Sequence, residues 1–385
     1  MRQRTTTLLA TLCITGALGS STALAIQDGS DVPRVGDPGG PGRFLDPVER
    51  EQWLRGRRLF DQPMHRSRGL GAPEMNADSC RGCHQDPAVG GAGGLELNVS
   101  RMGRNNSGVT PFMDVPGGQG LSKLRPPFHP GREEAPDTAD VFEQRQTPSI
   151  LGDGLIDAIP AAEILANEDP LDLDGDGIRG VARRISVGGV TEVGRFGWKA
   201  QVPRLADFVR DAAGGELGMT TSDDGRGFAL IADADVVADP ELSDAEVLDM
   251  AFFLLELGPP LRVDPTAQEV LTGEFLFHQI GCATCHVPSL MGPAGPVPLY
   301  SDLLLHDVAP SSYEGMAEPG ADVGVFRTPP LWGIRDTAPY MHDGSAETLR
   351  RAINVHRGEA TAAQQAYQAL SPADRTSLIA FLEDL

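Results

Sequence analysis

The feature that most constrains this chain is a pentapeptide that occurs twice. Residues 80–84 read C-R-G-C-H and residues 282–286 read C-A-T-C-H, so both have the pattern C-x-x-C-H. On one helical turn, the two thiols of such a motif can bond the vinyl groups of one haem edge, and the adjacent histidine reaches the iron from the same side. A zinc site would gather both cysteine pairs on one tetrahedron, and a thioredoxin-like pair has no use for the histidine. The sequence therefore predicts two covalently attached haems c. Their predicted attachment residues are Cys80, Cys83, Cys282 and Cys285, and their proximal iron ligands are His84 and His286.

The first residues have the pattern of an export signal. Arg2 and Arg4 precede an apolar stretch at residues 8–18, and residues 23–25 (A-L-A) form a small-residue cleavage site. The apolar stretch is too short to span a bilayer, and no later stretch is long enough to stop transfer. We therefore expect residues 1–25 to be a signal peptide that is cleaved near Ala25, which leaves a periplasmic protein without a membrane span; an uncleaved anchor is the alternative. Cys13 lies within this signal, so the two motifs contain all four cysteines of the mature chain.

The composition limits the kinds of partner. A formal net charge of −22 repels nucleic acid and anionic lipid, so no nucleic-acid partner is expected. The same charge either attracts a basic protein partner or only confers solubility. With 46 glycines, 31 prolines and only 5% aromatic residues, we expect long loops around compact helices, with haem supplying part of the apolar bulk of the core.

An internal repeat precedes the two motifs. Residues 56–60 read G-R-R-L-F and residues 273–277 read G-E-F-L-F, each on an expected helix that leads into C-x-x-C-H. The first helix has its start signals at residues 46–49 (D-P-V-E), with an N-cap, a proline in the first turn and an acid at the third position. Two cytochrome c-like domains explain the repeat. We therefore predict a mostly α fold with a flexible leader (26–45), an N-terminal haem domain with an insertion (46–260) and a C-terminal haem domain (261–385).

Further elements follow from local signals. Residues 181–200 alternate in polarity around Gly188 and Gly189, which predicts a small β-hairpin insertion. Residues 243–246 (S-D-A-E) form a capping box for a helix that ends at residues 258–260 (G-P-P), the predicted domain boundary. Another helix is expected from near Pro265, and a last one from residues 371–374 (S-P-A-D). The apolar face of this last helix consists of Leu378, Phe381, Leu382 and Leu385.

The distal ligand of the second haem has several candidates. The histidines and methionines that follow the second motif include His306, Met316, Met341, His342 and His356. Leu349, Ile353 and His356 stand at positions i, i+4 and i+7 of a helix that stops at Gly358, so His356 is expected on the buried side. His356 is the preferred ligand, and Met341 is the second choice.

The first haem lacks an evident distal ligand. The next histidine after His84 is His129, in a proline-rich stretch; Met102 is nearer, and His65 lies upstream. An open or weakly held distal position permits peroxide chemistry, whereas two strong ligands restrict a haem to electron transfer. The asymmetry between the two sites therefore indicates an enzyme.

Two pairs of residues between or beside the motifs have candidate roles. Peroxide cleavage needs a base that moves a proton between the two oxygens, and Asp157 and Glu163 flank an apolar segment where such a base could lie. The alternative is that both are surface acids, in a chain with 54 acidic residues. Trp198 and Trp332 either bind against the haems and relay electrons, or pack in the core.

A short acidic stretch resembles the start of a calcium loop. Asp172, Asp174 and Asp176 precede Gly177 with the spacing D-x-D-x-D-G, which can wrap three carboxylates around Ca²⁺. The twelfth residue of the loop is Arg183, not the glutamate of a full calcium loop. Calcium binding is therefore one prediction, and a tight acidic turn is the alternative.

Several segments resemble known di-haem proteins. Residues 326–333 (F-R-T-P-P-L-W-G) and 338–349 (A-P-Y-M-H-D-G-S-A-E-T-L) are similar to the second-haem domain of bacterial di-haem cytochrome c peroxidases. Four other segments resemble the di-haem oxidoreductase family, whose peroxidase-like members are sometimes labelled thiol oxidoreductases. These are residues 154–160 (G-L-I-D-A-I-P), 172–178 (D-L-D-G-D-G-I), 194–200 (G-R-F-G-W-K-A) and 356–360 (H-R-G-E-A). The resemblance extends from about Arg50 to the end of the chain.

The resemblance implies a two-domain, mostly helical protein that uses one haem for peroxide chemistry and the other to receive or relay electrons. It supports His356 as a ligand of the second haem, because its position is like that of the distal ligand of the peroxidases. Those peroxidases carry a histidine after the first motif where this chain has Ser100-Arg101-Met102. We therefore expect the first haem to be permanently open.

These observations predict a periplasmic di-haem oxidoreductase that reduces hydrogen peroxide with electrons from a small redox protein, either a cytochrome c or a cupredoxin. Two alternatives stay open. One is a non-enzymatic electron carrier with two six-coordinate haems. The other is haem-dependent oxidation of a side chain on a partner protein, as a cousin enzyme does with tryptophan.

Overall fold

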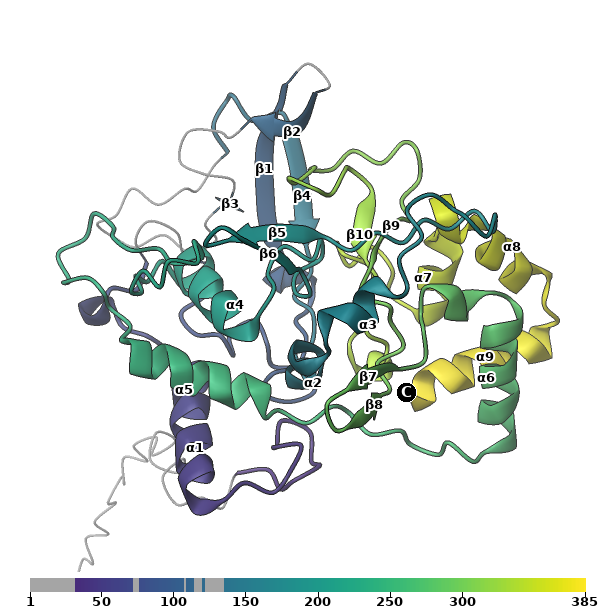
Figure 1. Ribbon diagram of the computed structural model, residues 1–385, viewed down its shortest axis with the longest axis horizontal. Helices are drawn as coiled ribbons and strands as arrows, with labels where there is room; N and C mark the ends of the chain where they lie inside the picture. Colours follow the sequence, from purple (N-terminus) through teal and green to yellow (C-terminus); the bar gives the residue numbers. More distant parts are fainter. Residues whose placement is uncertain (1–31, 72–75, 107–108, 114–119, 122–134) are drawn as a thin grey trace, which may run out of the picture. The chain divides into compact units, whose positions relative to one another are not determined.

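The computed structural model describes residues 32–71, 76–106, 109–113, 120–121 and 135–385, and it describes side chains for those outside residues 105–134. The predicted signal peptide, the start of the leader and His129 lie outside these ranges. Residues Arg34–Leu385 form one compact unit, which is shown in Figure 1. The predicted boundary at residue 260 lies inside this unit and stays a prediction.

Helices outweigh strands in the described chain, in agreement with the predicted mostly α class. The helices are α1 (Pro47–Asp61), α2 (Asp153–Ala158), α3 (Ala161–Leu165), α4 (Leu205–Ala212), α5 (Asp244–Leu255), α6 (Gln268–Gln279), α7 (Leu349–Val355), α8 (Thr361–Ala369) and α9 (Pro372–Asp384). The strands are β1 (Val99–Asn106), β2 (Val109–Met113), β3 (Gly120–Leu121), β4 (Val141–Arg145), β5 (Arg184–Val187), β6 (Val190–Val193), β7 (Leu290–Gly292), β8 (Gly295–Val297), β9 (Leu305–Asp307) and β10 (Val325–Arg327).

The helix starts follow the capping signals of the sequence. Asp46 accepts hydrogen bonds from the N–H groups of Val48 and Glu49 at the start of α1, and Glu49 closes the capping box. Ser243 and Glu246 form the same box at α5. Ser371 caps α9, whose predicted apolar face is buried. These caps satisfy N–H groups that have no partner within the helix, so the three predicted starts are confirmed.

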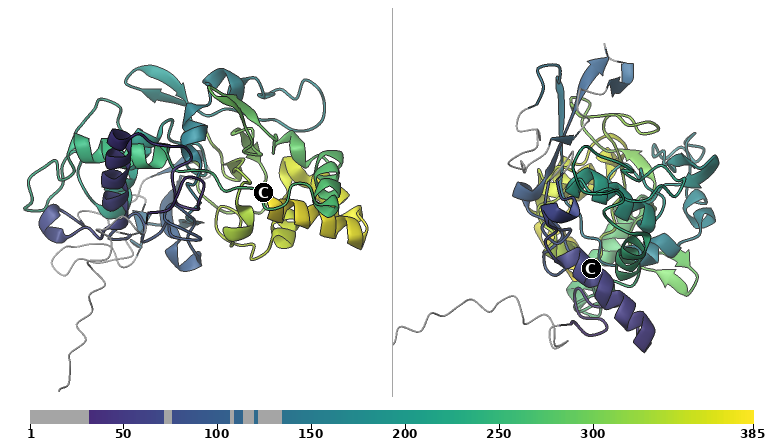
Figure 2. Two further views of the ribbon diagram at one scale, coloured as in Figure 1. Left: turned by 90° about the horizontal axis from the view of Figure 1, so that it is seen from below. Right: turned by 90° about the vertical axis from the view of Figure 1, so that its left-hand side faces the viewer.

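The internal repeat of the sequence is a repeat of structure. α1 packs against α5, and α6 packs against α9, as two separate helix pairs (Figures 1 and 2). A Cβ on Gly56 would lie 1.9 Å from the carbonyl oxygen of Asp249, and a Cβ on Gly273 would lie 2.0 Å from that of Ser377. In each pair, only a glycine lets the first helix come this close to the backbone of the second.

Equivalent aromatic contacts follow each glycine. Phe60 lies with its ring centroid 5.2 Å from that of Phe253 and 6.2 Å from that of His84. Phe277 lies 5.2 Å from Phe381 and 6.4 Å from the second-motif histidine. Each C-x-x-C-H histidine therefore sits against a like core of two helices and two phenylalanines. The N-terminal core is discontinuous in sequence, because residues 62–243 lie between α1 and α5.

The segment between α1 and α5 contains more strand than the sequence indicated. The predicted hairpin is present: β5 and β6 pair in antiparallel fashion around Gly188 and Gly189. A second sheet was not predicted. Its strands run in the order β2-β1-β3, and β4 also pairs with β1, in a register that sets Arg101 opposite Glu143.

The described part of the Gly/Pro-rich leader is bonded to the rest of the unit. Gly42 donates its N–H to the carbonyl of Glu256 at 2.8 Å, and Gly258 donates to the carbonyl of Gly40 at 3.0 Å. These bonds satisfy backbone groups on both segments, so residues 40–42 are held at the end of α5.

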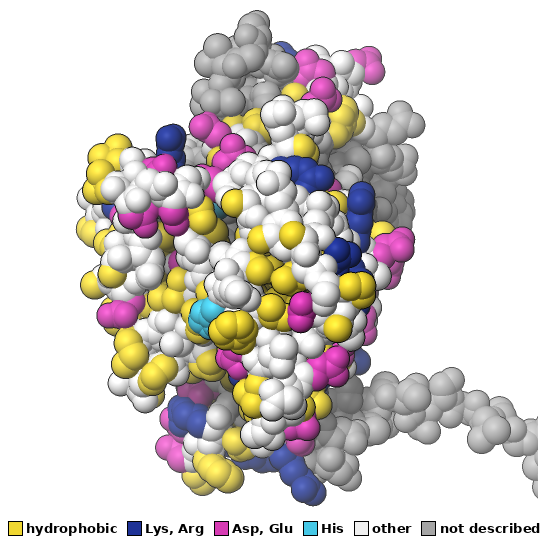
Figure 3. Space-filling model, turned by 90° about the vertical axis from the view of Figure 1, so that its right-hand side faces the viewer, with side chains coloured by type: hydrophobic (Ala, Val, Ile, Leu, Met, Phe, Trp, Pro, Cys, Tyr) yellow, Lys and Arg dark blue, Asp and Glu magenta, His cyan; other side chains and the backbone are white. Residues whose placement is uncertain are grey.

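The surface agrees with an acidic protein but has no single charged patch on the face that carries α6, α8 and α9. On this face, Figure 3 shows Asp and Glu side chains scattered among Lys, Arg and hydrophobic ones. Within the described residues, no helix has both the length and the apolar composition needed to cross a membrane.

Candidate active site

Both C-x-x-C-H motifs open into one shared cavity of about 1080 Å³. It is slightly larger than the ~300–1,000 Å³ of single small-molecule sites. Its lining includes all four motif cysteines and both motif histidines: Cys80, Cys83, His84, Cys282, Cys285 and His286. The structure therefore brings the two predicted attachment sites to the same internal space.

The two motif histidines are held in the same way. In both motifs the histidine N–H donates to the carbonyl of the first cysteine at 3.0 Å, which closes one helical turn. The Nδ1 atom of His84 lies 3.0 Å from the carbonyl of Pro148, and that of His286 lies 2.9 Å from the carbonyl of Tyr300. Because a carbonyl only accepts, Nδ1 carries the proton and Nε2 keeps its lone pair. Burial lowers the pKa of each histidine to about 4, so both are neutral, as an iron ligand must be.

None of the four motif cysteines is joined in a disulfide. Burial raises the pKa of Cys80 and of Cys282 to about 12. Thiol redox chemistry needs an accessible thiolate with a lowered pKa. These thiols therefore do not fit a thiol oxidoreductase, and they do fit attachment to a haem edge.

His356 lines the same cavity as the second motif histidine. It follows the last turn of α7, and its Nδ1 lies 2.7 Å from the carbonyl of Ala352. Its side chain lines the cavity and lies close enough to His286 to affect the pKa of that residue. Both imidazoles thus have Nδ1 tied to a backbone carbonyl and Nε2 available, which is the arrangement required for two histidines on one iron.

The other candidates for this position are engaged elsewhere or lie outside the cavity. The two ring nitrogens of His306 lie 2.8 Å from the carboxylates of Asp302 and Glu359. Burial lowers the pKa of His306, but these hydrogen bonds outweigh it and raise the pKa to about 12. A protonated imidazole has no lone pair for a metal. His342 shares its Nε2 with the hydroxyl of Tyr313 at 2.6 Å.

Met341, the second choice as ligand, also lines the cavity. Its backbone has φ of 72°, an unusual conformation for a residue other than glycine. Met316 is buried and is absent from the described cavity lining.

The described candidates for a distal ligand of the first iron, unlike His356, do not line the cavity. His65 is exposed and caps a short 3₁₀ turn through Nδ1, which accepts the N–H of Ser67. Met102 is buried in β1, and neither residue is among the described side chains that line the cavity. His129 lies outside the described residues. Among the described residues, none of the distal ligands that the sequence suggested for the first iron lines the cavity. The second iron, in contrast, has His356.

Arginine side chains line the cavity and would complement haem carboxylates. Arg101, Arg145 and Arg327 all contribute to the lining. Glu318 pairs with Arg101 at 2.5 Å and with Arg145 at 3.3 Å. Arg327 is buried and donates only to carbonyl oxygens, those of Gly197 and Thr328. Asp153 lies close enough to Arg327 to interact with its charge, but no described carboxylate is hydrogen-bonded to this buried guanidinium, which favours a negatively charged ligand in the cavity.

The comparisons with known proteins agree with this site. A model of the family described as "Di-haem oxidoreductase, putative peroxidase" matches residues 138–385, which is more than half of the chain. The chain belongs to the di-haem oxidoreductase family. It is therefore an oxidoreductase of an enzyme family with two haems. No curated protein matches the chain.

Two solved structures are similar to the chain at low identity. One is a MauG-like protein associated with microbial copper homeostasis, with 18% identity, a TM-score of 0.45, and coverage of 92% of this chain and 94% of that chain. The other is hydrazine synthase of Kuenenia stuttgartiensis, with 16% identity, a TM-score of 0.44, and coverage of both whole chains. TM-scores this low leave the assignment resting on the family match and on the site.

The carboxylates predicted as bases do not belong to the described cavity lining of this di-haem oxidoreductase. Asp157 accepts the N–H of Leu205 at 2.8 Å, at the start of α4, and Glu163 lies on α3. Neither is among the described residues that line the cavity. Asp157 instead caps a helix, because it satisfies an N–H group at a helix start.

Two other carboxylates do face the cavity with raised pKa values. Burial raises the pKa of Asp153 to about 7, against the charge of Arg327. Asp211 on α4 is exposed by surface area but lines the cavity, and the desolvation there raises its pKa to about 6, against the charge of Arg101. A carboxyl with a pKa near neutrality can take up and release a proton under working conditions. Sequence gave no signal for either residue, since only the fold brings them to the cavity.

Trp198 and Trp332 both line the cavity that the two motifs share. The indole N–H of Trp198 donates to the carbonyl of Gln146 at 2.8 Å. Trp332 is buried against Gly152, where a Cβ would lie 2.7 Å from its ring. Their positions suit both packing and electron relay.

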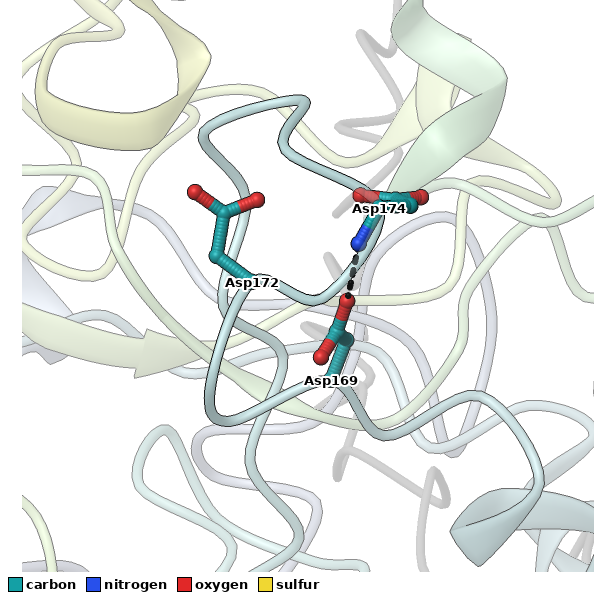
Figure 4. A group of neighbouring side chains, drawn as sticks. All are labelled: Asp169, Asp172 and Asp174. Atoms are coloured by element: carbon teal, nitrogen blue, oxygen red, sulfur yellow. Dashed lines mark hydrogen bonds between the residues drawn. The ribbon is translucent and has the colours of Figure 1, made fainter.

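The predicted calcium loop is an acidic turn in which the carboxylates bind backbone N–H groups. Oxygens of Asp169, Asp172 and Asp174 lie within 4.8 Å of one another (Figure 4), and this group includes Asp169 in place of the expected Asp176. Asp169 accepts the N–H of Leu173 at 2.7 Å, and Asp176 accepts that of Ile178 at 2.8 Å. These bonds explain the turn without an ion. Calcium binding stays a prediction.

Proposed function

We propose that the chain is an exported, periplasmic c-type enzyme that reduces hydrogen peroxide at its first haem. In this proposal Cys80 and Cys83 hold one haem and Cys282 and Cys285 hold the other. His84 is the one protein ligand of the first iron, whereas His286 and His356 bind the second. When bound, the two haems supply the redox centres that pass electrons to peroxide. The observation that carries the proposal is the difference between the two sites, because two strong ligands close an iron to substrate.

The protein residues divide the remaining work. Reduction of one peroxide to two waters consumes two electrons and two protons. Asp211 faces the cavity with a pKa of about 6, so its carboxylate can accept a proton from one peroxide oxygen and return it to the other. Trp198 and Trp332 are in a position to assist electron transfer between the two centres.

The electron donor would be a small redox protein, a cytochrome c or a cupredoxin. The net charge of −22 favours a basic donor and faster association at low salt. The scatter of acidic side chains in Figure 3 gives no single docking patch on that face.

The test is peroxide consumption by the haem-loaded protein with a reduced small cytochrome as donor. The proposal expects donor oxidation at two equivalents per peroxide. A variant with Cys80→Ala and Cys83→Ala should contain one haem per chain in place of two and should lose turnover. Full turnover in that variant, or no peroxide consumption by the two-haem protein, would contradict the proposal.

A further inference from the structure

The hydroxyl of Tyr313 has two strong partners close to the cavity. It lies 3.0 Å from Oε2 of Glu143 and 2.6 Å from Nε2 of His342. Glu143 also accepts the N–H of Met316 at 2.9 Å and pairs with Arg145. Tyr313 is thus hydrogen-bonded to a carboxylate that the fold holds in place.

The charges fix the direction of these hydrogen bonds. Burial raises the pKa of Glu143, but the charge of Arg145 and the N–H of Met316 outweigh it, and the net pKa is lowered. Glu143 is therefore ionised and can only accept. Tyr313 must donate its O–H to Glu143, so His342 donates its Nε2–H to the phenolic oxygen. Burial and the charge of Glu143 raise the pKa of Tyr313, which keeps the phenol protonated at rest.

Aromatic rings connect Tyr313 to the cavity. Its ring centroid lies 5.2 Å from that of His342 and 5.9 Å from that of Phe326. His342 and Phe326 are stacked at 3.9 Å, and Trp198 lies 6.4 Å from His342. Trp198, Phe326 and His342 all line the cavity. One ring therefore separates Tyr313 from the space assigned to the haems.

We propose that Tyr313 is a redox-active residue that supplies one electron to the haem centre after hydrogen peroxide has oxidised it. The O–H bond of Tyr313 breaks as the electron leaves, and the proton passes to Oε2 of Glu143. A phenoxyl radical remains, and the Nε2–H of His342 continues to bond its oxygen. One electron from the donor protein and the proton on Glu143 then restore the phenol. The oxidant comes from the proposed peroxide activity, so the inference rests on that function.

Two other tyrosines differ in ways that serve as controls. Tyr340 lines the cavity, but its hydroxyl donates to the carbonyl of Ile334, which cannot take up a proton. Tyr300 donates to the carboxylate of Glu274 at 3.1 Å and is a rival, although it lies outside the described cavity lining. Tyr→Phe at each position removes a hydroxyl and keeps the ring.

The test is EPR of the haem-loaded protein, frozen after reaction with peroxide and, separately, after flash photo-oxidation by a ruthenium polypyridyl complex. The proposal expects a free-radical signal that narrows when the tyrosines are ring-deuterated. Tyr313→Phe should abolish it, whereas Tyr340→Phe and Tyr300→Phe should retain it. Glu143→Gln removes the proton acceptor and should slow radical formation by about 10²-fold or more.

The two oxidants separate this inference from the proposed function. A Tyr313-dependent radical under photo-oxidation, without peroxide consumption, would support the tyrosine and sink the peroxidase activity. Peroxide turnover without a Tyr313-dependent radical under either oxidant would overturn the tyrosine alone. A radical that survives Tyr313→Phe and is lost in Tyr300→Phe would assign the role to the rival.

Discussion

Asp211 gives the sharpest prediction for the reaction. Its carboxyl faces the cavity from α4 with a pKa raised to about 6. A group with that pKa is about 90% ionised at pH 7 and about 10% ionised at pH 5. If the carboxylate is the base, the rate of peroxide reduction should fall about tenfold between pH 7 and pH 5. Asp211→Asn removes the base and should lower kcat by about 10²- to 10⁴-fold while flattening this pH step.

The assay is steady-state oxidation of a reduced cytochrome by peroxide, followed by absorbance from pH 5 to pH 8. Asp157→Asn is the matched control, because it makes the same substitution at a carboxyl outside the described cavity lining and asparagine can still cap α4. That control should stay within about twofold of the parent protein. An Asp211→Asn variant with full turnover and an unchanged pH step would refute the assignment, as would a larger loss in Asp157→Asn.

Three other predictions test the architecture of the site. His356→Ala should leave the second iron with one protein ligand, so its low-spin EPR signal should become high-spin; an unchanged low-spin signal would exclude His356 as ligand. Gly273→Ala places a Cβ about 2.0 Å from the carbonyl of Ser377 and should lower the free energy of unfolding by about 1–3 kcal/mol in urea titrations, and an unchanged midpoint would contradict the close helix contact. Because the folded pKa of His306 is raised to about 12, its protonation stabilises the fold fully below its unfolded pKa of about 6.5. That contribution is lost progressively as pH rises toward 12, so the stability lead of the parent over His306→Gln should shrink from pH 6 to pH 9; a constant lead would argue against a charged His306.

The sequence predicted those parts of the fold that are determined by residues close together in the chain. Residues 46–49 and 243–246 carry a cap and its reciprocal acid within one turn, so the starts of α1 and α5 could be predicted. The repeat of Gly56 and Gly273 was visible because both precede a C-x-x-C-H motif. That α5 completes the core of α1 was not visible, because the two helices lie almost 200 residues apart (Figure 1).

The unpredicted parts depend on contacts between distant segments. The sequence of β1 does not alternate between polar and apolar residues, so it gave no strand signal. Its residue Arg101 instead pairs with Glu318 and lies opposite Glu143 in the sheet, and both partners are distant in sequence. The base was sought at Asp157, where an acid flanks an apolar segment, but the fold places that side chain at a helix start. Asp211 looks like any other acid on a polar helix until α4 is set against the cavity.

The most direct measurement is an EPR spectrum of the oxidised protein with both haems bound, recorded with and without cyanide. The account predicts one low-spin signal that cyanide leaves unchanged, from the iron held by His286 and His356. It also predicts one high-spin signal that cyanide converts to low spin, from the iron held by His84 alone. Two low-spin signals, both indifferent to cyanide, would show that neither iron is open and would contradict peroxide reduction at the first haem.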